Sequence, residues 1–187
     1  IGLWNCSALG HALSSLVSEE SQGEILQTYE PIFQKTLAEL YQKKLGLIKL
    51  NKDDAQLIQG LLDIMESEKL DYTNTFRNIS QAITNEETPE LNTHIAKSWI
   101  KSYQARHKIE PSSIKGKVSL INKNNPKFIL RNYMAQEAIE AAENLNLSML
   151  ETLIHVITHP YDELEQFEYF ASRSPDWAKD IEISCSS

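Results

Sequence analysis

Two histidines four residues apart are the first residues in this sequence with spacing suited to chemistry. His155 and His159 would lie on one face of a helix, the arrangement by which two imidazoles can share a metal ion. No third ligand stands at a suitable offset, and no glutamate follows the first histidine. The pair indicates either a weak metal site or ordinary surface or core histidines; we favour the second and assign no metal ligand.

Three acidic pairs, at positions 53–54, 86–87 and 162–163, could act as paired carboxylates in acid–base catalysis. Each stands at or near an expected helix start, where negative charge stabilises the positive end of the helix dipole. The sequence also has no glycine-rich phosphate loop, no GxSxG elbow and no nucleophile with a local base signature. We therefore assign no catalytic and no cofactor-binding residue to this chain.

The densest polar cluster is the segment NNPKFILRNY, residues 124–133. Arg131 and Asn132 interrupt an apolar run, so they are either exposed or buried with full hydrogen bonding, because an unpaired buried charge is very unfavourable. Arg131 could bind loop carbonyls or a distant carboxylate, and Asn132 can both donate and accept. We interpret Asn125, Pro126, Arg131 and Asn132 as a structural motif, with a direct substrate role as the less favoured alternative.

The two cysteines, Cys6 and Cys185, are too few for a disulfide scaffold and have no CxxC spacing for zinc. A reducing compartment fits this usage. Cys185 is the third residue from the end of the chain, where an exposed thiol would be open to redox chemistry.

Helical periodicity runs through almost the whole chain and predicts an all-α fold. Apolar residues recur at three- and four-residue spacing over 9–17, 25–45, 57–65, 76–83, 91–103, 129–142 and 150–157, with a further short helix over 164–170. The pattern lapses between Lys108 and Asn125, where we expect a hinge or a long connection.

Several helix starts carry capping residues. Asp53 or Asp54 can cap the helix before Leu57, and Asp71 can cap the next one. The sequence Thr88-Pro89-Glu90 predicts a third start. Ser148 and Glu151 have the spacing of a capping box.

The formal net charge of −8 disfavours a general nucleic-acid or anionic-membrane binder. No apolar run approaches the roughly 20 residues of a membrane helix, so we expect no membrane partner.

The chain begins at Ile1 without an initiator methionine or a secretory signal. We therefore expect a single helical region over 1–187 that is part of a longer chain.

The run NPKFILRNYMAQEAIEAAE, residues 125–143, resembles the NP-x-x-x-LRN-Y-x-AQ-x-AI-x-x-AE signature of the selenoprotein O family. The resemblance extends in order from IGLWNCSALGHAL at the start, through KKLGL and DYTNTFR, to PDWAKDIEISCSS at the end. Cys6 departs from the family, which often has leucine there. The resemblance implies the helical C-terminal region of a protein-kinase-like fold.

Members of this family are protein adenylyltransferases that use ATP and magnesium and transfer AMP to hydroxyl side chains of proteins. The resemblance implies that the catalytic residues lie upstream of Ile1, so this chain alone should bind neither ATP nor magnesium. It also implies two kinds of partner, namely the upstream kinase-like lobe of the same protein and protein substrates. We expect a bacterial cytoplasmic protein, with a mitochondrial location as the alternative.

In the family, the position of Cys185 holds a cysteine or selenocysteine that can pair with an upstream cysteine. The resemblance therefore implies a redox-regulatory role for Cys185 within a tail of residues 178–187.

The alternative for the whole chain is a stand-alone helical protein-interaction domain without catalysis.

Overall fold

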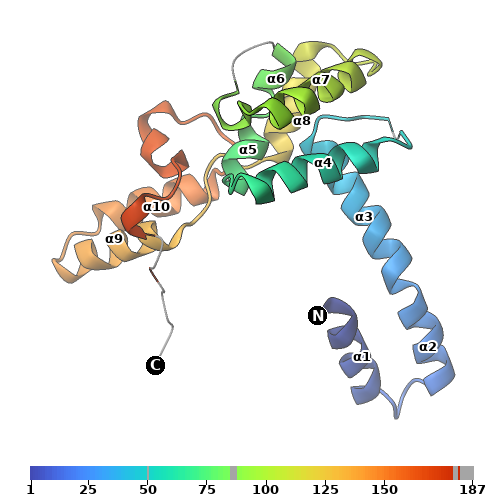
Figure 1. Cartoon of the computed structure of the whole chain (residues 1–187). Coiled ribbons are helices and arrows are strands. Elements are labelled where there is room, and N and C mark those ends of the chain that lie inside the picture. The colour runs from blue at the N-terminus through green and yellow to red at the C-terminus, as the bar shows by residue number, and fades with distance from the viewer. Residues whose placement is uncertain (50, 85–87, 179–180, 182–187) are drawn as a thin grey trace. The chain divides into compact units, whose positions relative to one another are not determined.

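The computed structural model describes residues 1–49, 51–84, 88–178 and 181. All regular structure in these residues is helical, with ten α-helices and three short 3-10 segments and no strand (Figure 1), which confirms the all-α prediction. None of the described helices is long and apolar enough to cross a membrane. The chain divides into two compact units, Ile1–Gln42 and Lys43–Ser187, where the sequence led us to expect one region.

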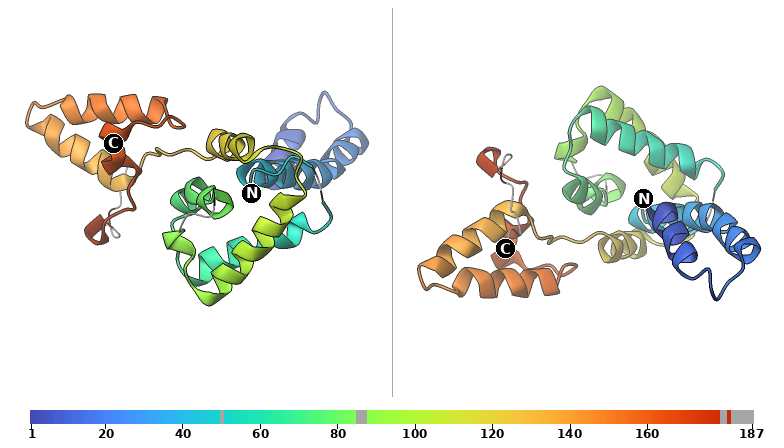
Figure 2. Two further views of the ribbon diagram at one scale, coloured as in Figure 1. Left: turned by 90° about the horizontal axis from the view of Figure 1, so that it is seen from above. Right: turned by 90° about the horizontal axis from the view of Figure 1, so that it is seen from below.

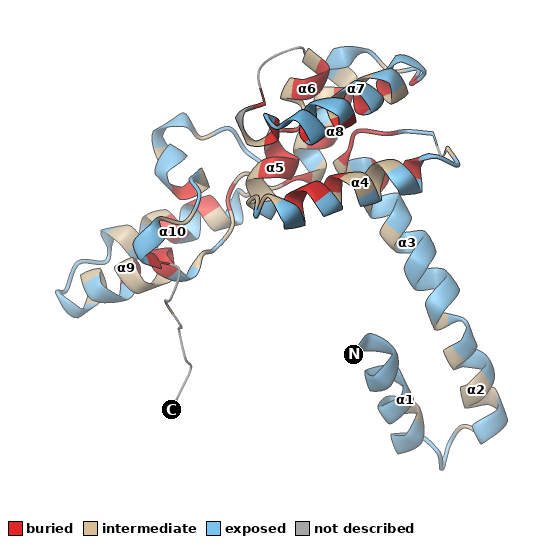
Figure 3. Cartoon of the chain, in the orientation of Figure 1, coloured by how far each residue is buried: buried red, intermediate tan, exposed pale blue. Residues whose placement is uncertain are grey.

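Unit 1, residues Ile1–Gln42, consists of α1 (Gly2–Ala12), α2 (Glu19–Gln27) and most of α3 (Tyr29–Lys44). The side chain of Ser18 caps α2 by accepting a hydrogen bond from the Ser21 backbone N–H. Pro31 lies in the first turn of α3, where its missing N–H is tolerated. Gln42 is the one buried residue of this unit, and Figure 3 shows α1 almost entirely exposed and α2 with both exposed and intermediate residues.

Unit 2 begins with a group of helices that pack around a shared core. They are α4 (Asp54–Ser67), α5 (Tyr72–Asn78), α6 (Gln81–Thr84), the 3-10 turn Pro89–Leu91, α7 (His94–Lys108) and α8 (Ile114–Asn124). Helix α7 packs against α4 and α6, and α5 packs against α8. Leu45, Leu61, Phe76, Tyr103 and Ile121 are at most 1% exposed in the core that results.

The rest of unit 2 is a helical pair with two 3-10 segments. Helices α9 (Asn132–Glu143) and α10 (Ser148–Thr158) lie side by side (Figure 2), and the 3-10 segments Glu165–Ala171 and Asp176–Ala178 follow them. Phe128, Met134, Leu153, Val156 and Phe170 are buried together in a second core.

The connection expected between Lys108 and Asn125 is wrong for most of its length, because α8 occupies Ile114–Asn124. Ser113 is the N-cap of this helix and accepts a hydrogen bond from the Gly116 N–H at 3.2 Å. Serine and glycine are typical of loops, but Ser113 and Gly116 form the first turn of α8, whose Ile121 is fully buried.

Among the side-chain caps predicted at helix starts, the one at Asp71 is confirmed and those at Thr88 and Ser148 are wrong. Asp71 caps α5 as expected, accepting from the Asn74 N–H at 2.9 Å. The start expected at Thr88 is wrong for the long helix, since only a 3-10 turn begins there and α7 begins after Thr93. The Ser148 capping box is also wrong, because Ser148 lies inside α10 and its N–H donates to the side chain of Asn146 at 3.0 Å.

Gly46 ends α3 in a conformation that other residues rarely adopt, with φ of +69°. A Cβ here would lie 2.7 Å from Cγ1 of Ile121 and 3.2 Å from the carbonyl oxygen of Lys117. We therefore expect Gly46→Ala to lower the free energy of unfolding by roughly 2–4 kcal/mol, from left-handed strain plus overpacking. Urea unfolding monitored by circular dichroism measures this loss.

Gly23→Ala is the matched control for that substitution. Gly23 lies inside α2, and a Cβ added there would meet no atom within 4 Å, so alanine should raise stability by about 0.5–1 kcal/mol. Equal effects of the two substitutions would contradict the conformational argument.

Candidate functional site

Asn125 joins the C-terminal ends of α3 and α8. Its side chain is buried, and its Nδ2 donates to the carbonyl oxygens of Lys44 at 2.8 Å and Ile121 at 2.9 Å. Its Oδ1 accepts from Nζ of Lys44 at 3.1 Å. Pro126 requires an extended residue before it, and Asn125 has φ −130° and ψ 106°, which ends α8 at this point.

Arg77, on α5, lies beside Asn125 and is 8% exposed. Its Nη1 donates to the carbonyl oxygens of Asn122 at 2.9 Å and Asn125 at 2.8 Å. Its Nη2 donates to the carbonyl oxygen of Tyr161 at 3.3 Å and to the carboxylate of Glu163. One guanidinium thus holds together α5, the end of α8 and the turn after α10. Sequence reasoning did not single out Arg77, although it is the last residue of the run DYTNTFR.

Lys127 completes this junction on the other side of Glu163. Its Nζ donates to Glu163 at 2.8 Å and also to Glu168, and its backbone N–H donates to the carbonyl oxygen of Pro160. Burial alone would raise the pKa of Glu163, but hydrogen bonds and charge from Lys127 and Arg77 outweigh it and lower that pKa. The carboxylate of Glu163 is therefore held in its charged form between two cations.

Arg131 and Asn132 belong to two further contacts rather than to the Asn125 junction. Arg131 binds the carboxylate of Asp71 with both terminal nitrogens, at 2.6 and 3.1 Å, and so reaches the residue that caps α5. Burial acts to raise the pKa of Asp71, yet the hydrogen bonds from Arg131 and the Asn74 backbone lower it overall. Asn132 is more exposed and donates to the carbonyl oxygen of Ile181 at 3.2 Å.

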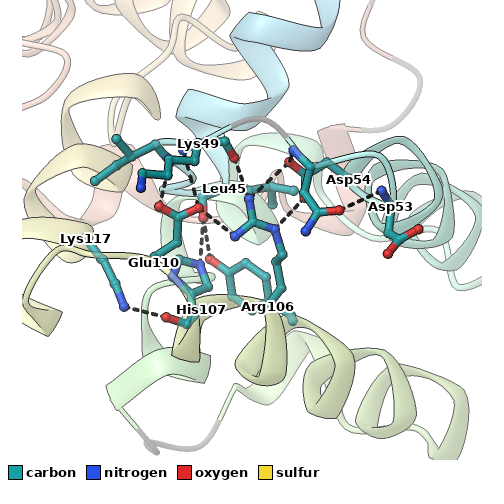
Figure 4. Close-up of polar contacts among 11 residues, drawn as sticks. Leu45, Lys49, Asp53, Asp54, Arg106, His107, Glu110 and Lys117 are labelled. Carbon is teal, nitrogen blue, oxygen red and sulfur yellow. Dashed lines mark hydrogen bonds and ion pairs between the residues drawn. The ribbon is translucent and has the colours of Figure 1, made fainter.

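A second buried network centres on Arg106 of α7 (Figure 4). Its Nε donates to Asp54 at 2.6 Å, its Nη1 donates to Glu110 at 2.6 Å, and its Nη2 donates to the Lys49 carbonyl oxygen. The side chains of Asp54 and Glu110 are 4% and 0% exposed. The side-chain cap expected at Asp53 or Asp54 is therefore wrong, because Asp53 is the N-cap residue of α4 but its side chain accepts no capping hydrogen bond, and the carboxylate of Asp54 pairs with Arg106.

The carbonyl oxygen of Leu45 accepts two hydrogen bonds next to this network (Figure 4), one from the Tyr103 hydroxyl at 2.8 Å and one from Nε2 of His107 at 3.0 Å. Because a carbonyl only accepts, Nε2 of His107 carries the proton. Burial is the main cause that lowers the pKa of His107 to about 4, and the nearby Lys117 adds to it.

His107 should make stability depend on pH. Its folded-state pKa of about 4 lies below the ordinary 6.5, so between these values the unfolded chain binds a proton that the folded chain does not. Stability should therefore fall as pH drops from about 6.5 to about 4. Urea unfolding across this range should show a steeper fall for the wild type than for His107→Gln, which cannot titrate there. Parallel curves for the two proteins would contradict the prediction.

The charged side chains of Arg77, Arg106 and Arg131 pair with carboxylates from distant parts of the chain. In the part of the chain that the structure describes, no three histidine, cysteine, aspartate or glutamate side chains lie close enough to hold a metal ion. The rings of His155 and His159 are 4.7 Å apart, and Nδ1 of His159 lies 2.9 Å from the His155 carbonyl oxygen. Cys6 has an exposed free thiol, while Cys185 lies outside the described residues.

The family model described as Protein adenylyltransferase SelO matches residues 1–158, which include Arg77, Arg106 and Arg131. The chain belongs to the SelO family. The match ends before Tyr161 and Glu163, so the Arg77 junction joins the SelO-matching helices to the segment that follows them.

Similar bacterial proteins include three that are named protein nucleotidyltransferase YdiU. Those of Vibrio atlanticus and Aliivibrio salmonicida are 38% and 37% identical over 191 residues, and that of Erwinia tasmaniensis is 38% identical over 192 residues. Each alignment includes all of this SelO-family chain but only 39% or 40% of the relative. The chain thus spans about two-fifths of the length of the curated relatives it matches.

Proposed function

We propose that this chain is the C-terminal helical part of a Mg-ATP-dependent protein adenylyltransferase, which transfers AMP from ATP to hydroxyl side chains of proteins. The observation that carries the proposal is the SelO family match over residues 1–158, together with the fraction of each relative that the chain spans. The names of the relatives, nucleotidyltransferases, support the same general reaction.

In this proposal, ATP and magnesium bind to an upstream kinase-like lobe of the same protein. The present chain supports that lobe and is inactive alone. Arg77 and Arg106 support a scaffolding role because their donors are used by carbonyls and carboxylates inside the fold. The protein acts on other proteins, in the bacterial cytoplasm.

Radioactive ATP labelled on the α- or the γ-phosphate shows which part of ATP is transferred to protein. The full-length protein with magnesium should transfer radioactivity from α-labelled ATP to a protein substrate or to itself, whereas γ-labelled ATP should leave no label on protein. Transfer of the γ-label instead would indicate a kinase and would overturn the proposal. A full-length reading frame without a kinase-like lobe would overturn it as well.

Cys185 is proposed as a redox-regulatory thiol that pairs reversibly with a cysteine in the upstream lobe. Cys185→Ser in the full-length enzyme should abolish the difference in adenylylation between reduced and oxidised protein. Cys6→Ser is the control and should keep that difference, because in this proposal the partner of Cys185 is a cysteine of the upstream lobe and not Cys6. An enzyme with Cys185→Ser that still responds to reductant would contradict this role.

A stand-alone helical interaction domain is the second candidate. The exposed apolar side chains of unit 1 favour it, since a surface of this kind marks an interaction site. It predicts that the 187-residue chain is a stable protein with its own binding partner and that no kinase-like lobe is encoded with it.

A further inference from the structure

Unit 1 has helices but no hydrophobic core of its own. All buried hydrophobic side chains among the described residues lie at Leu45 or beyond, outside this unit. Most of its large apolar side chains are instead exposed, and Leu16, Trp4 and Ile25 are 81%, 73% and 63% exposed. Figure 3 shows the same pattern, with α1 coloured almost entirely as exposed and α2 as a mixture of exposed and intermediate residues.

Helices of this length are not stable without burial. Helices α1 and α2 have 11 and 9 residues, and isolated helices shorter than roughly 12–15 residues are marginal in water. Most helix stability in proteins comes from packing of an apolar face. The exposed apolar side chains of unit 1 must therefore be covered by another surface in the working protein.

The surface has a hollow that indicates what covers it. A pocket of about 390 Å³ is lined by Cys6 of α1 and by residues of α2 and α3, among them Ile25, Tyr29, Ile32 and Phe33. The rings of Tyr29 and Phe33 are stacked, 5.9 Å apart, and form one wall. Every lining residue is uncharged, so the hollow fits apolar side chains of the covering segment.

The charge of unit 1 argues against a second copy as the cover. Residues 1–42 contain five glutamates, at positions 19, 20, 24, 30 and 39, and one lysine, Lys35, which gives a net charge of −4 with His11 neutral. A dimer through this surface would bring two such units face to face, and like charges across an interface are unfavourable. A covering surface with an apolar centre and a neutral or basic rim fits better.

We propose that this surface of unit 1 binds the part of the same polypeptide that lies outside these 187 residues. The proposal rests on the proposed function, in which the chain is part of a longer enzyme. The relatives have about three-fifths of their length outside the aligned region, which supplies a segment large enough to cover three helices. Unit 1 is therefore the docking element that connects this helical region to the remainder of the protein.

Photo-crosslinking in the full-length protein identifies the cover directly. Phe33→p-benzoylphenylalanine places a crosslinker on the wall of the hollow, and mass spectrometry locates the peptide that it joins. We expect a crosslink within one polypeptide to a segment outside the 187 residues. A crosslink to residues 43–187, a crosslinked dimer, a crosslink to a different protein, or no crosslink would each overturn the proposal.

The thiol of Cys6 gives an independent readout. In the full-length protein, maleimide should label Cys6 at least about tenfold more slowly than in the same protein unfolded in urea, because the cover excludes the reagent. Phe33→Asp should restore most of that reactivity, since burying its charge under the cover is costly. The matched control is Ile154→Asp, which changes an exposed apolar residue of α10 and should leave Cys6 protected. Full reactivity of Cys6 in the wild type would contradict the proposal.

Neither experiment uses ATP. A protein that gives the expected crosslink but transfers no AMP would contradict the proposed function and leave the docking surface intact. Transfer of AMP without the crosslink would do the opposite.

Discussion

Arg106→Ala is expected to lower the free energy of unfolding by about 3–5 kcal/mol, the range for removing one partner of a buried ion pair. The substitution leaves the carboxylates of Asp54 and Glu110 without their cation, and both side chains are almost fully buried. It also removes a donor from the carbonyl oxygen of Lys49. Urea unfolding of the wild type and the variant under the same conditions measures the loss.

Two control substitutions on α7 separate charge from geometry. Arg106→Lys keeps the positive charge but loses the planar guanidinium that reaches both carboxylates. Its free energy of unfolding should therefore lie between those of the wild type and Arg106→Ala. Lys101→Ala changes an exposed cation on the same helix and should alter stability by less than about 0.5 kcal/mol. A similarly small effect for Arg106→Ala would show that the buried network does not stabilise the fold.

Asn125→Asp is expected to cost at least about 3 kcal/mol at neutral pH, although the two side chains have nearly the same shape. The Nδ2 group of Asn125 donates to two buried carbonyl oxygens, those of Lys44 and Ile121. A carboxylate in its place would face both carbonyls with oxygen atoms and no donor. Nζ of Lys44 would offset only part of the repulsion, because it approaches from the Oδ1 side.

The pH dependence of that variant provides a second test. Burial should favour the neutral form of the introduced carboxyl, so the deficit should be largest at neutral pH and smaller near pH 4. Asn124→Asp is the neighbouring control. Its side chain is only partly buried and makes one bond, from Nδ2 to the Leu120 carbonyl oxygen, so a carboxylate there stays solvated and should cost about 1 kcal/mol or less. Equal losses for the two variants would exclude the buried amide as the cause.

The sequence predicted the elements whose signal is local. Apolar stripes located α4, α7, α9 and α10, and the Asp71 cap was correct because a cap and the N–H that it accepts from lie three residues apart. The failures involve competition between similar local signals. At α10, Asn146 rather than Ser148 accepts the first hydrogen bonds, and in α8 the serine and glycine that suggest a loop begin a helix instead.

The bonding partners of Arg77 and Arg106 could not be assigned from the sequence in the same way. A charged residue in an amphipathic helix normally faces solvent, and nothing beside Arg77 or Arg106 in the sequence distinguishes them from Arg173. Their partners lie far away along the chain, with Glu163 86 residues from Arg77 and Asp54 52 residues from Arg106. Arg131 could be identified as a structural residue because it interrupts an apolar run. Its partner Asp71 lies 60 residues away, so the sequence alone could not identify that bond.

The bridge between Asn125 and Lys44 also has a consequence for the growing chain. The two residues are 81 positions apart, so at about 5–20 residues per second the ribosome needs roughly 4–16 s after adding Lys44 before it adds Asn125. During this interval α4 to α7 can pack against one another. The end of α3, however, still lacks the side chain of Asn125, whose Oδ1 later accepts a hydrogen bond from Nζ of Lys44. The nascent protein therefore carries an incomplete junction at the end of α3 until Asn125 has been added.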